Sequence, residues 1–340
     1  MLFVIGLAKK VLLADSIAPW AEAGFAAPQD QLLLAAWGTA LAYALQLYFD
    51  FSGYSDMAMG LAKMFGVRFP LNFNSPYKST GIIEFWQKFH MTLTRYLTAY
   101  LYNPIALAVA RRRAMRGLPV GRKATATVGG FASLTLFPTM MTMGLAGIWH
   151  GAGSQFLIFG LLHGMYLTIN HAWRQFKPVR QHAAVKGSFG DRAANAAYVL
   201  ITFIAVVVAL LFFRAASTQD AFALIKGMLG LRGVGDLAAI AYPLQAWSDA
   251  HLAVGNVLRT FVERWGQGLL TAALLLIVWF APNSNQIMAQ YSPALEGPDV
   301  SKSRFLRWRP SPLWAAVFVV MLFYCLLHLT KTARFLYFQF

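Results

Sequence analysis

The chain has 340 residues, of which 58% are hydrophobic and only 12% are charged, and its formal net charge is +16. Because a soluble domain carries about 25% charged residues, this composition excludes an ordinary soluble protein and predicts an integral membrane protein. The one cysteine, Cys325, excludes an internal disulfide. Since it lies in an apolar run, we expect it to be a small buried side chain.

Six apolar segments predict membrane-spanning helices: 31–49, 125–148, 154–173, 194–213, 267–281 and 312–330. Residues 2–14 contain two lysines and are short for a span, so we expect an interfacial helix there and no signal peptide. Segments 54–66 and 219–230 predict amphipathic surface helices. Segment 82–109 is long enough to cross a membrane, but its polar residues also fit a helix that lines a cavity.

The expected fold class is therefore all-α. We expect a polytopic transmembrane protein with about 6–8 membrane segments, plus amphipathic or re-entrant helices, in a single domain over residues 1–340.

The basic residues are concentrated in three loops between the apolar segments, 111–123, 174–192 and 302–309, which hold 15 of the 29 Lys and Arg residues. This distribution is typical of cytoplasmic loops and also suits anionic lipid head groups, so we do not expect nucleic-acid binding. If the three loops are cytoplasmic, segment 125–148 runs outward and 154–173 returns. The turn between them then lies toward the outer side, or at depth as a re-entrant turn.

That turn contains the most informative motif, Trp149-His150-Gly151. An ionisable imidazole is costly to place at membrane depth, so it points to a functional site. Gly147, Gly151 and Gly153 disfavour a continuous helix, and broken backbone is tolerated there where it lines a cavity. His150 could take a proton from a hydroxyl group; alternatively, it is a structural pin bonded to a neighbouring carbonyl.

Two further histidines are candidates. His90 shares a polar-interrupted helix with Lys88 and Arg95, where it could act as a second acid or base or polarise an acyl carbonyl; alternatively, this is a polar face packed on other helices. His163 follows His150 by about 20 Å along a straight helix, so the two share no reaction centre unless the backbone folds back. We expect His163 to be structural or to support the site.

A polar group closes the 31–49 segment and consists of Asp50, Ser52, Tyr54 and Asp56. These side chains could bind a polar substrate or orient a histidine. The alternative is an ordinary helix terminus, with Asp56 capping the following helix.

Several classes of site are absent from the sequence. It has no P-loop, dinucleotide-binding glycine pattern, Gly-x-Ser-x-Gly elbow or His-Glu-x-x-His motif. The histidines do not have the compact spacing of metal ligands, and no paired carboxylates indicate an ion-coupled transporter. We therefore expect no metal and no bound cofactor.

Taken together, the motifs resemble the membrane-bound O-acyltransferase (MBOAT) family. The resemblance is strongest to the bacterial branch of alginate O-acetylation membrane proteins, whereas the teichoic-acid D-alanylation proteins are similar but less close. The matching segments keep the order of the family and extend over nearly the whole chain. They are Asp50–Ala58, Asn72–Tyr77, Phe85–His90, Trp149–Ala152, Leu162–Gly164 and Phe335–Phe340.

The resemblance implies transfer of an acetyl or other short acyl group toward an extracytoplasmic polysaccharide such as alginate, with acetyl-CoA or another cytoplasmic acyl thioester as donor. It implies that His150 is catalytic and that His90 is the second polar position, and we expect Trp149, Lys88 and Arg95 to support them. It also implies a periplasmic acetyltransferase partner and a polysaccharide biosynthesis or export complex, in a multi-pass protein of the bacterial inner membrane.

Two features depart from the family pattern. Relatives begin with several more transmembrane segments, so we expect this chain to lack the N-terminal helices of the full family. Relatives also often read Phe-Trp-Arg-Arg-Trp-His where this chain has Gln87, Lys88 and Phe89, which keeps one positive charge but not the guanidinium fork. The rival hypothesis is a polysaccharide or lipid-linked sugar transporter, or an export scaffold, with the Asp50–Asp56 segment binding sugar and His150 structural.

Overall fold

The computed structural model describes residues 1–121, 123–176, 189–235, 256–297 and 306–329, and these contain helices and turns but no β-strand. The all-α prediction is confirmed for this part of the chain. The chain divides into two compact units, unit 1 (Met1–Ser75 and Arg214–Phe340) and unit 2 (Pro76–Phe213). The three candidate histidines therefore belong to unit 2 and the Asp50–Asp56 segment to unit 1.

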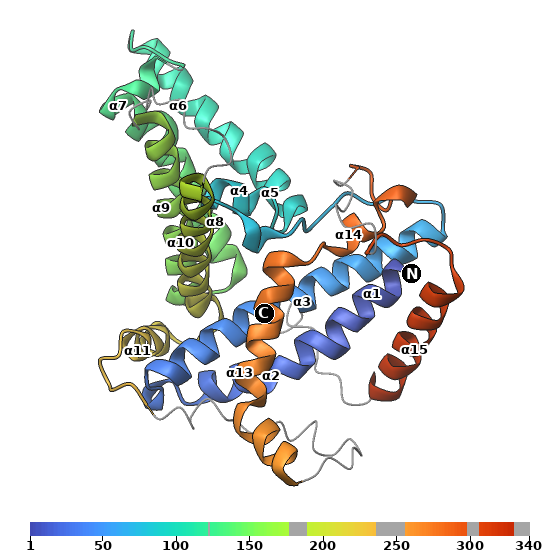
Figure 1. Cartoon of the computed structure of the whole chain (residues 1–340). Helices are drawn as coiled ribbons and strands as arrows, with labels where there is room; N and C mark the ends of the chain where they lie inside the picture. Colours follow the sequence, from blue (N-terminus) through green and yellow to red (C-terminus); the bar gives the residue numbers. More distant parts are fainter. Residues whose placement is uncertain (122, 177–188, 236–255, 298–305, 330–340) are drawn as a thin grey trace. The chain divides into compact units, whose positions relative to one another are not determined.

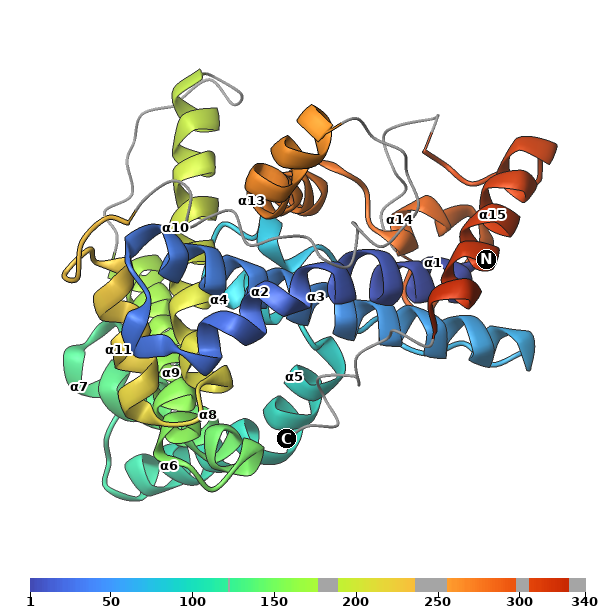
Figure 2. The ribbon, with the colours of Figure 1, turned by 90° about the horizontal axis from the view of Figure 1, so that it is seen from below.

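Two long helical runs lie side by side in unit 1 (Figure 2). The first comprises α1 (Leu2–Ala8), the π-helical turn η1 (Lys9–Ala14) and α2 (Asp15–Ala26), and the second is α3 (Leu33–Met64). Gly6 and Gly53 face each other between the runs, because a methyl group on either would collide with the backbone of the opposite helix. Small residues allow this close approach between membrane helices.

The boundaries that the sequence predicts for both runs are wrong. The first run continues past residue 14 into α2. Lys9 and Lys10, which suggested an interfacial helix, form ion pairs with Asp56 and Asp50 of α3 and are thereby neutralised. In the second run, the predicted span 31–49 and surface helix 54–66 form one helix of 32 residues, about 48 Å long at 1.5 Å per residue. Asp56 therefore lies inside α3 and does not cap a following helix.

The remaining helices of unit 1 are α11 (Thr218–Met228), α13 (Asn256–Phe280), α14 (Ser284–Ile287) and α15 (Pro312–His328), with 3-10 turns η2 (Pro28–Asp30) and η8 (Ala289–Tyr291). Of these helices, α11 and α15 follow the predicted segments 219–230 and 312–330 closely, whereas α13 begins eleven residues before the predicted segment 267–281 and α14 was not predicted. Ser217 and Ser311 cap α11 and α15 through their side chains, and Asn283 forms a capping box with Gln286 at α14. Such caps satisfy backbone N–H groups that a helix start leaves unpaired.

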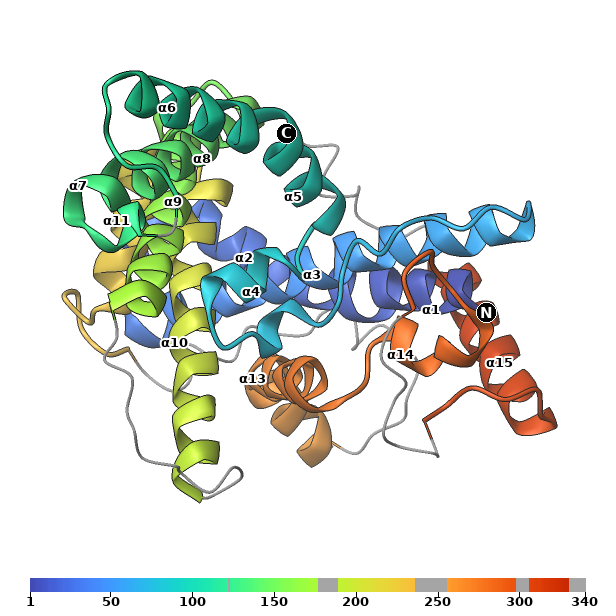
Figure 3. The same cartoon turned by 90° about the horizontal axis from the view of Figure 1, so that it is seen from above.

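The first half of unit 2 differs from the single long helix that 82–109 could form. The 3-10 turn η3 (Pro76–Lys78) and the short α4 (Ile82–Trp86) precede a break at residues 87–90. A second run follows, made of α5 (Met91–Leu97), the π-helical turn η4 (Thr98–Tyr102) and α6 (Asn103–Met115) (Figure 3). The break places the Trp86-to-His90 motif in a turn and not on a helix face.

The second half of unit 2 contains a helical hairpin. The 3-10 turn η5 (Ala124–Ala126) leads into α7 (Val128–Phe131), η6 (Ala132–Leu136) and α8 (Phe137–His150), and α9 (Ser154–Phe176) returns beside α8 (Figure 1). A methyl group on Gly147 or Gly160 would overlap the backbone of the opposite helix, so these glycines set how closely the two helices pack. The last helix is α10 (Phe189–Arg214).

Two helical stretches among the described residues are long and apolar enough to cross a membrane, Val128–His150 and Phe189–Arg214, and the shorter Gly268–Phe280 and Pro312–His328 are also apolar. The full number of 6–8 segments, the loop orientation and the single domain stay predictions. Part of the basic loops and one matching segment lie outside the described residues, namely Arg122, Lys177, Arg180, Lys186, Lys302, Arg304 and Phe335–Phe340.

Candidate active site

His150 is the last residue of α8, at the turn of the hairpin. The helix stops there because Gly151, Ala152 and Gly153 separate it from the start of α9 at Ser154, as the glycine pattern predicts. The imidazole is half-buried, and its ring centre lies 4.8 Å from that of Trp149 and 5.0 Å from that of Phe213. An aromatic surround of this kind keeps water away from one face of the ring.

His163 lies on α9 and is 1% exposed. Its Nδ1 accepts a hydrogen bond of 3.3 Å from Nε1 of Trp86 on α4, and because an indole N–H only donates, a neutral His163 carries its proton on Nε2. The hydrogen bond ties the hairpin to the α4 turn.

The separation of about 20 Å between His150 and His163 holds only for a straight helix, and the backbone instead folds back at Gly151, the exception that the prediction named. The Phe159 ring is near both histidines, with its centre 6.1 Å from that of His150 and 4.7 Å from that of His163. The two imidazoles therefore share a phenyl neighbour.

His90 lies in the turn between α4 and α5 with φ +46° and ψ +52°. This left-handed conformation is uncommon outside glycine, although histidine, asparagine and aspartate adopt it more readily than most residues. Thr92 Oγ1 lies 3.5 Å from its Nδ1. A constrained backbone of this kind often accompanies a functional position.

His90 in the α4–α5 turn and His150 at the end of α8 both belong to unit 2, and a charge on His150 acts on His90 electrostatically. They come from segments sixty residues apart in the sequence and both are mostly withdrawn from solvent. Of two neutral imidazoles that act on one substrate, one can accept a proton and the other can donate a hydrogen bond. This pairing is suited to activating a hydroxyl group next to a polarised carbonyl.

The predicted supporting residues have different surroundings. Lys88 forms an ion pair of 2.6 Å with Glu84, one helical turn before it, while Trp149 is 62% exposed and Arg95 is also exposed. Partial burial favours the neutral form of Glu84, but hydrogen bonds from Lys88 and Thr80 more than offset it and lower the pKa of the carboxyl group. Lys88 therefore neutralises the Glu84 carboxylate of α4.

The candidate substrate-binding residues of α3 are engaged within unit 1. Lys9 Nζ lies 2.6 Å from Asp56 and donates to Ser52 and Ser284, and Lys10 Nζ lies 2.6 Å from Asp50. Asp50, Ser52 and Asp56 are buried, whereas Tyr54 is 43% exposed.

Sequence reasoning missed the partners of these carboxylates, because nothing links positions 9 and 10 to α3 until the helices pack. The unusual pair of lysines in an apolar segment was the available signal. Within the described residues, no group of three or more His, Cys, Asp or Glu side chains could hold a metal ion.

Residues 12–117 match the family model of the membrane-bound O-acyltransferases. The chain belongs to this family. The predicted family is therefore confirmed. The matched MBOAT segment includes His90 and ends before His150.

Several characterised or named MBOAT proteins are similar to the chain. It is 40% identical over 233 residues to a peptidoglycan O-acetyltransferase of Helicobacter pylori, which covers 68% of this chain and 39% of that protein. It is 39% identical over 226 residues to a probable alginate O-acetylase of Pseudomonas aeruginosa, and this alignment covers 66% of this chain and 37% of that protein. A teichoic acid D-alanyltransferase of Streptococcus thermophilus is 29% identical over 180 residues, and this alignment covers 52% of this chain and 40% of that protein. The chain spans about two fifths of the length of these relatives.

Proposed function

We propose that this chain is a membrane O-acyltransferase of the bacterial inner membrane that moves an acetyl group from a cytoplasmic thioester, such as acetyl-CoA, to a hydroxyl group of an extracytoplasmic polysaccharide. The observation that carries the proposal is the place of His150 at the end of an apolar hairpin, surrounded by aromatic rings and within electrostatic reach of His90. Relatives named for peptidoglycan and alginate O-acetylation support the class of reaction.

In this mechanism His150 is the general base. Its neutral imidazole takes the proton of the acceptor hydroxyl while that oxygen attacks the thioester carbonyl. The tetrahedral intermediate collapses, the carbon–sulfur bond breaks, and the thiolate leaves with the proton that His150 has taken. One ester forms and one thioester is consumed.

His90 assists from the facing turn. A ring N–H directed at the carbonyl oxygen would stabilise the negative charge that develops on it, and fixed donors of this kind cost no reorganisation during the reaction. The left-handed backbone at His90 sets the direction in which its side chain leaves the turn.

His163, Trp86 and Phe159 support the pair. The buried Trp86–His163 hydrogen bond joins α4 to α9. The Phe159 ring packs near both His163 and His150. Accurate placement of reacting groups is itself a large share of catalysis.

The acceptor in our proposal is an exopolysaccharide such as alginate, reached directly or through a periplasmic acetyltransferase that works with an export complex. The teichoic acid D-alanyltransferase relative keeps D-alanyl transfer as the second candidate within the family. A D-alanyl donor carries an ammonium group, so a carboxylate close to His150 would be needed to favour it.

The sugar-transporter alternative has less support. It relies on Asp50 and Asp56 for sugar binding, and these carboxylates are held by Lys10 and Lys9 at 2.6 Å. A sugar would have to replace two buried ion pairs, whose disruption is costly.

The proposal is tested by acetylation of the host exopolysaccharide in a deletion strain complemented with wild type or His150→Ala. We expect rescue by wild type only, at equal membrane levels of both proteins. Equal rescue would make His150 structural. If neither protein rescues, the assigned substrate is wrong.

A further inference from the structure

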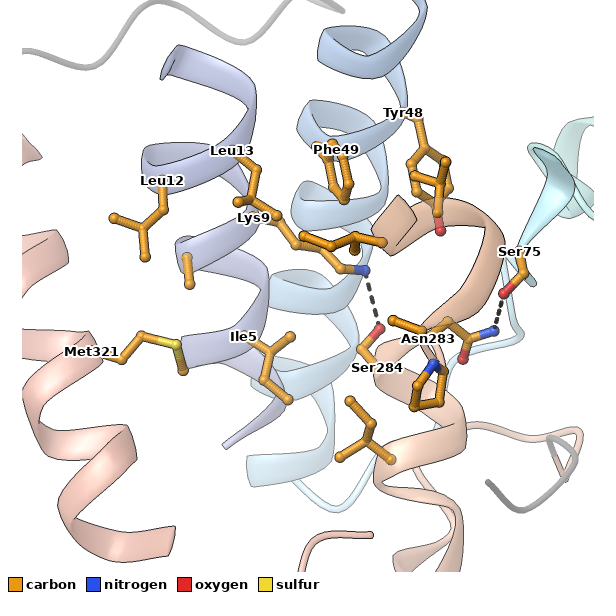
Figure 4. Close-up of a pocket in the computed structure, with 16 residues that line it drawn as sticks. Ile5, Lys9, Leu12, Leu13, Tyr48, Phe49, Ser75, Asn283, Ser284 and Met321 are labelled. Carbon is orange, nitrogen blue, oxygen red and sulfur yellow. Dashed lines mark hydrogen bonds between the residues drawn. The ribbon is translucent and has the colours of Figure 1, made fainter. Parts of the chain in front are cut away.

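Unit 1 contains a cavity of about 270 Å³ that is separate from the histidine pair of unit 2. Its walls come from five parts of the sequence, namely α1 with η1, the middle of α3, Ser75, the segment from α13 to α14, and α15 (Figure 4). Most of the lining is aliphatic. The main apolar contributors are Ile5, Leu12, Leu13, Ile277, Ile287 and Met321.

The polar groups at the cavity bond with one another. Lys9 Nζ lies 2.6 Å from Asp56 and 3.1 Å from Ser284 Oγ, and Ser284 Oγ donates to Asp56 at 2.6 Å. Next to Ser284, Asn283 Nδ2 donates to Asn74 and Ser75, both at 2.9 Å. A lysine ammonium has three donors, and here all three point at protein oxygens, including Ser52. The charge in the wall is therefore neutralised without a ligand.

The chemistry of the lining selects an uncharged, apolar occupant. An anion would have to compete with Asp56 for Lys9, and a polar ligand would find few unsatisfied partners. Water is a poor occupant as well, because apolar cavities stay dry. Empty apolar space, however, forfeits the dispersion contacts that close packing provides.

The helix α15, which borders the cavity, also carries exposed apolar side chains. Met321 of α15 lines the cavity, while Val319, Val320 and Phe323 of the same helix are 65%, 68% and 63% exposed. In a membrane protein these exposed apolar side chains face lipid tails. In a membrane, lipid tails would therefore surround the faces of α15 that point away from the cavity.

We propose that this cavity binds one acyl chain of a membrane phospholipid. The acyl chain would lie between η1, α14 and α15, with the Lys9–Asp56–Ser284 group at the inner wall of the cavity. This site is independent of acyl transfer at His150.

The test uses the full chain reconstituted in vesicles of phosphatidylethanolamine and phosphatidylglycerol, with a trace of phosphatidylethanolamine that carries a diazirine on one acyl chain. After photolysis, mass spectrometry of peptides locates the label. We expect it to concentrate on the peptides that contain Leu12, Ile277 and Met321, and to saturate as the probe is increased. An even label along the exposed side of α15, without saturation, would overturn the proposal.

A cavity-filling variant makes the test sharper. In Leu13→Trp the indole would occupy the space, so labelling at Ile277 and Met321 should fall about tenfold, the change that corresponds to a modest loss of binding energy. Leu313→Trp is the matched control, since Leu313 lies on α15, is 67% exposed and does not line the cavity. If Leu13→Trp does not insert into the membrane, Ile5→Phe repeats the test with a smaller change. Unchanged labelling in the variant that inserts would contradict the proposal.

Discussion

His90 and His150 are held by different means. His150 is positioned by aromatic rings around the end of α8, whereas His90 is positioned by its own backbone, with φ +46°. This difference matters for mutagenesis. Replacement of His150 changes mainly the imidazole, while replacement of His90 also changes how easily the turn forms.

The role of His90 can be separated from its backbone conformation. We predict that His90→Ala lowers acyl transfer by about 10²–10³-fold, the usual effect of removing one donor to a developing oxyanion. His90→Asn should recover part of that loss, because asparagine keeps an N–H donor and tolerates the left-handed conformation. Initial rates of acetyl transfer would be compared at equal protein levels. Equal rates for His90→Asn and His90→Ala would argue against a donor role.

The Trp86–His163 hydrogen bond has a measurable effect on stability. Trp86→Phe keeps an aromatic ring and leaves a buried acceptor without its donor, which costs about 1–3 kcal/mol. We expect a lower midpoint of thermal unfolding in detergent. The control is Trp149→Phe, since Trp149 is 62% exposed and should change the midpoint little. A drop of the same size in both variants would refute this view of His163.

At the scale of elements, the α8–α9 hairpin depends on close helix contact. A methyl group on Gly160 would overlap the backbone of α8, whereas one on Gly144 would meet Leu161 at an ordinary 3.5 Å. We therefore predict that Gly160→Ala destabilises the protein by about 1–3 kcal/mol through overpacking, and that Gly144→Ala does not. Thermal unfolding of the two variants, which add the same methyl group, checks this. Similar midpoints would contradict the packing.

Several elements could be predicted from sequence and others could not, for identifiable reasons. The break at Gly151 was predictable because glycines disfavour a helix, and α11 was visible in its amphipathic pattern. The continuity of α3 was not predictable, because Asp50 and Asp56 indicate a helix end in the sequence. Only the fold shows that Lys10 and Lys9 neutralise them.

The candidate site shows the same limit. The sequence identifies His90 and His150 individually, but only the fold brings them within electrostatic reach of each other. The left-handed turn at His90 and the Trp86 bond to His163 leave no local signal, since both depend on packing against α8 and α9.

The buried ion pairs of unit 1 give a prediction at this scale too. Lys9→Met would leave Asp56 as an uncompensated buried charge, and such changes cost about 3–5 kcal/mol. Adding Asp56→Asn removes the charge and should restore most of the stability. Unfolding midpoints of the single and double variants measure the coupling. If the double variant is no more stable than Lys9→Met, the ion pair is not what Lys9 contributes.

At the scale of the whole molecule, the account requires that the hairpin turn face the outside and the basic loops the cytoplasm. Cysteine labelling tests this, after the one natural cysteine is replaced by Cys325→Ala. With a membrane-impermeant maleimide, we predict that exposed Ala152→Cys reacts in spheroplasts, and that exposed Arg112→Cys reacts only after permeabilisation. The opposite pattern would invert the topology that the basic loops predict.

The most direct test of the central claim is transfer of a radiolabelled acetyl group from acetyl-CoA to glycan in membrane vesicles that contain wild type or His150→Gln. Glutamine keeps a polar side chain of similar reach but cannot act as a base. We predict a loss of about 10²–10⁴-fold, the usual contribution of general acid–base catalysis, with unchanged membrane insertion. Transfer at the wild-type rate in His150→Gln would contradict the account.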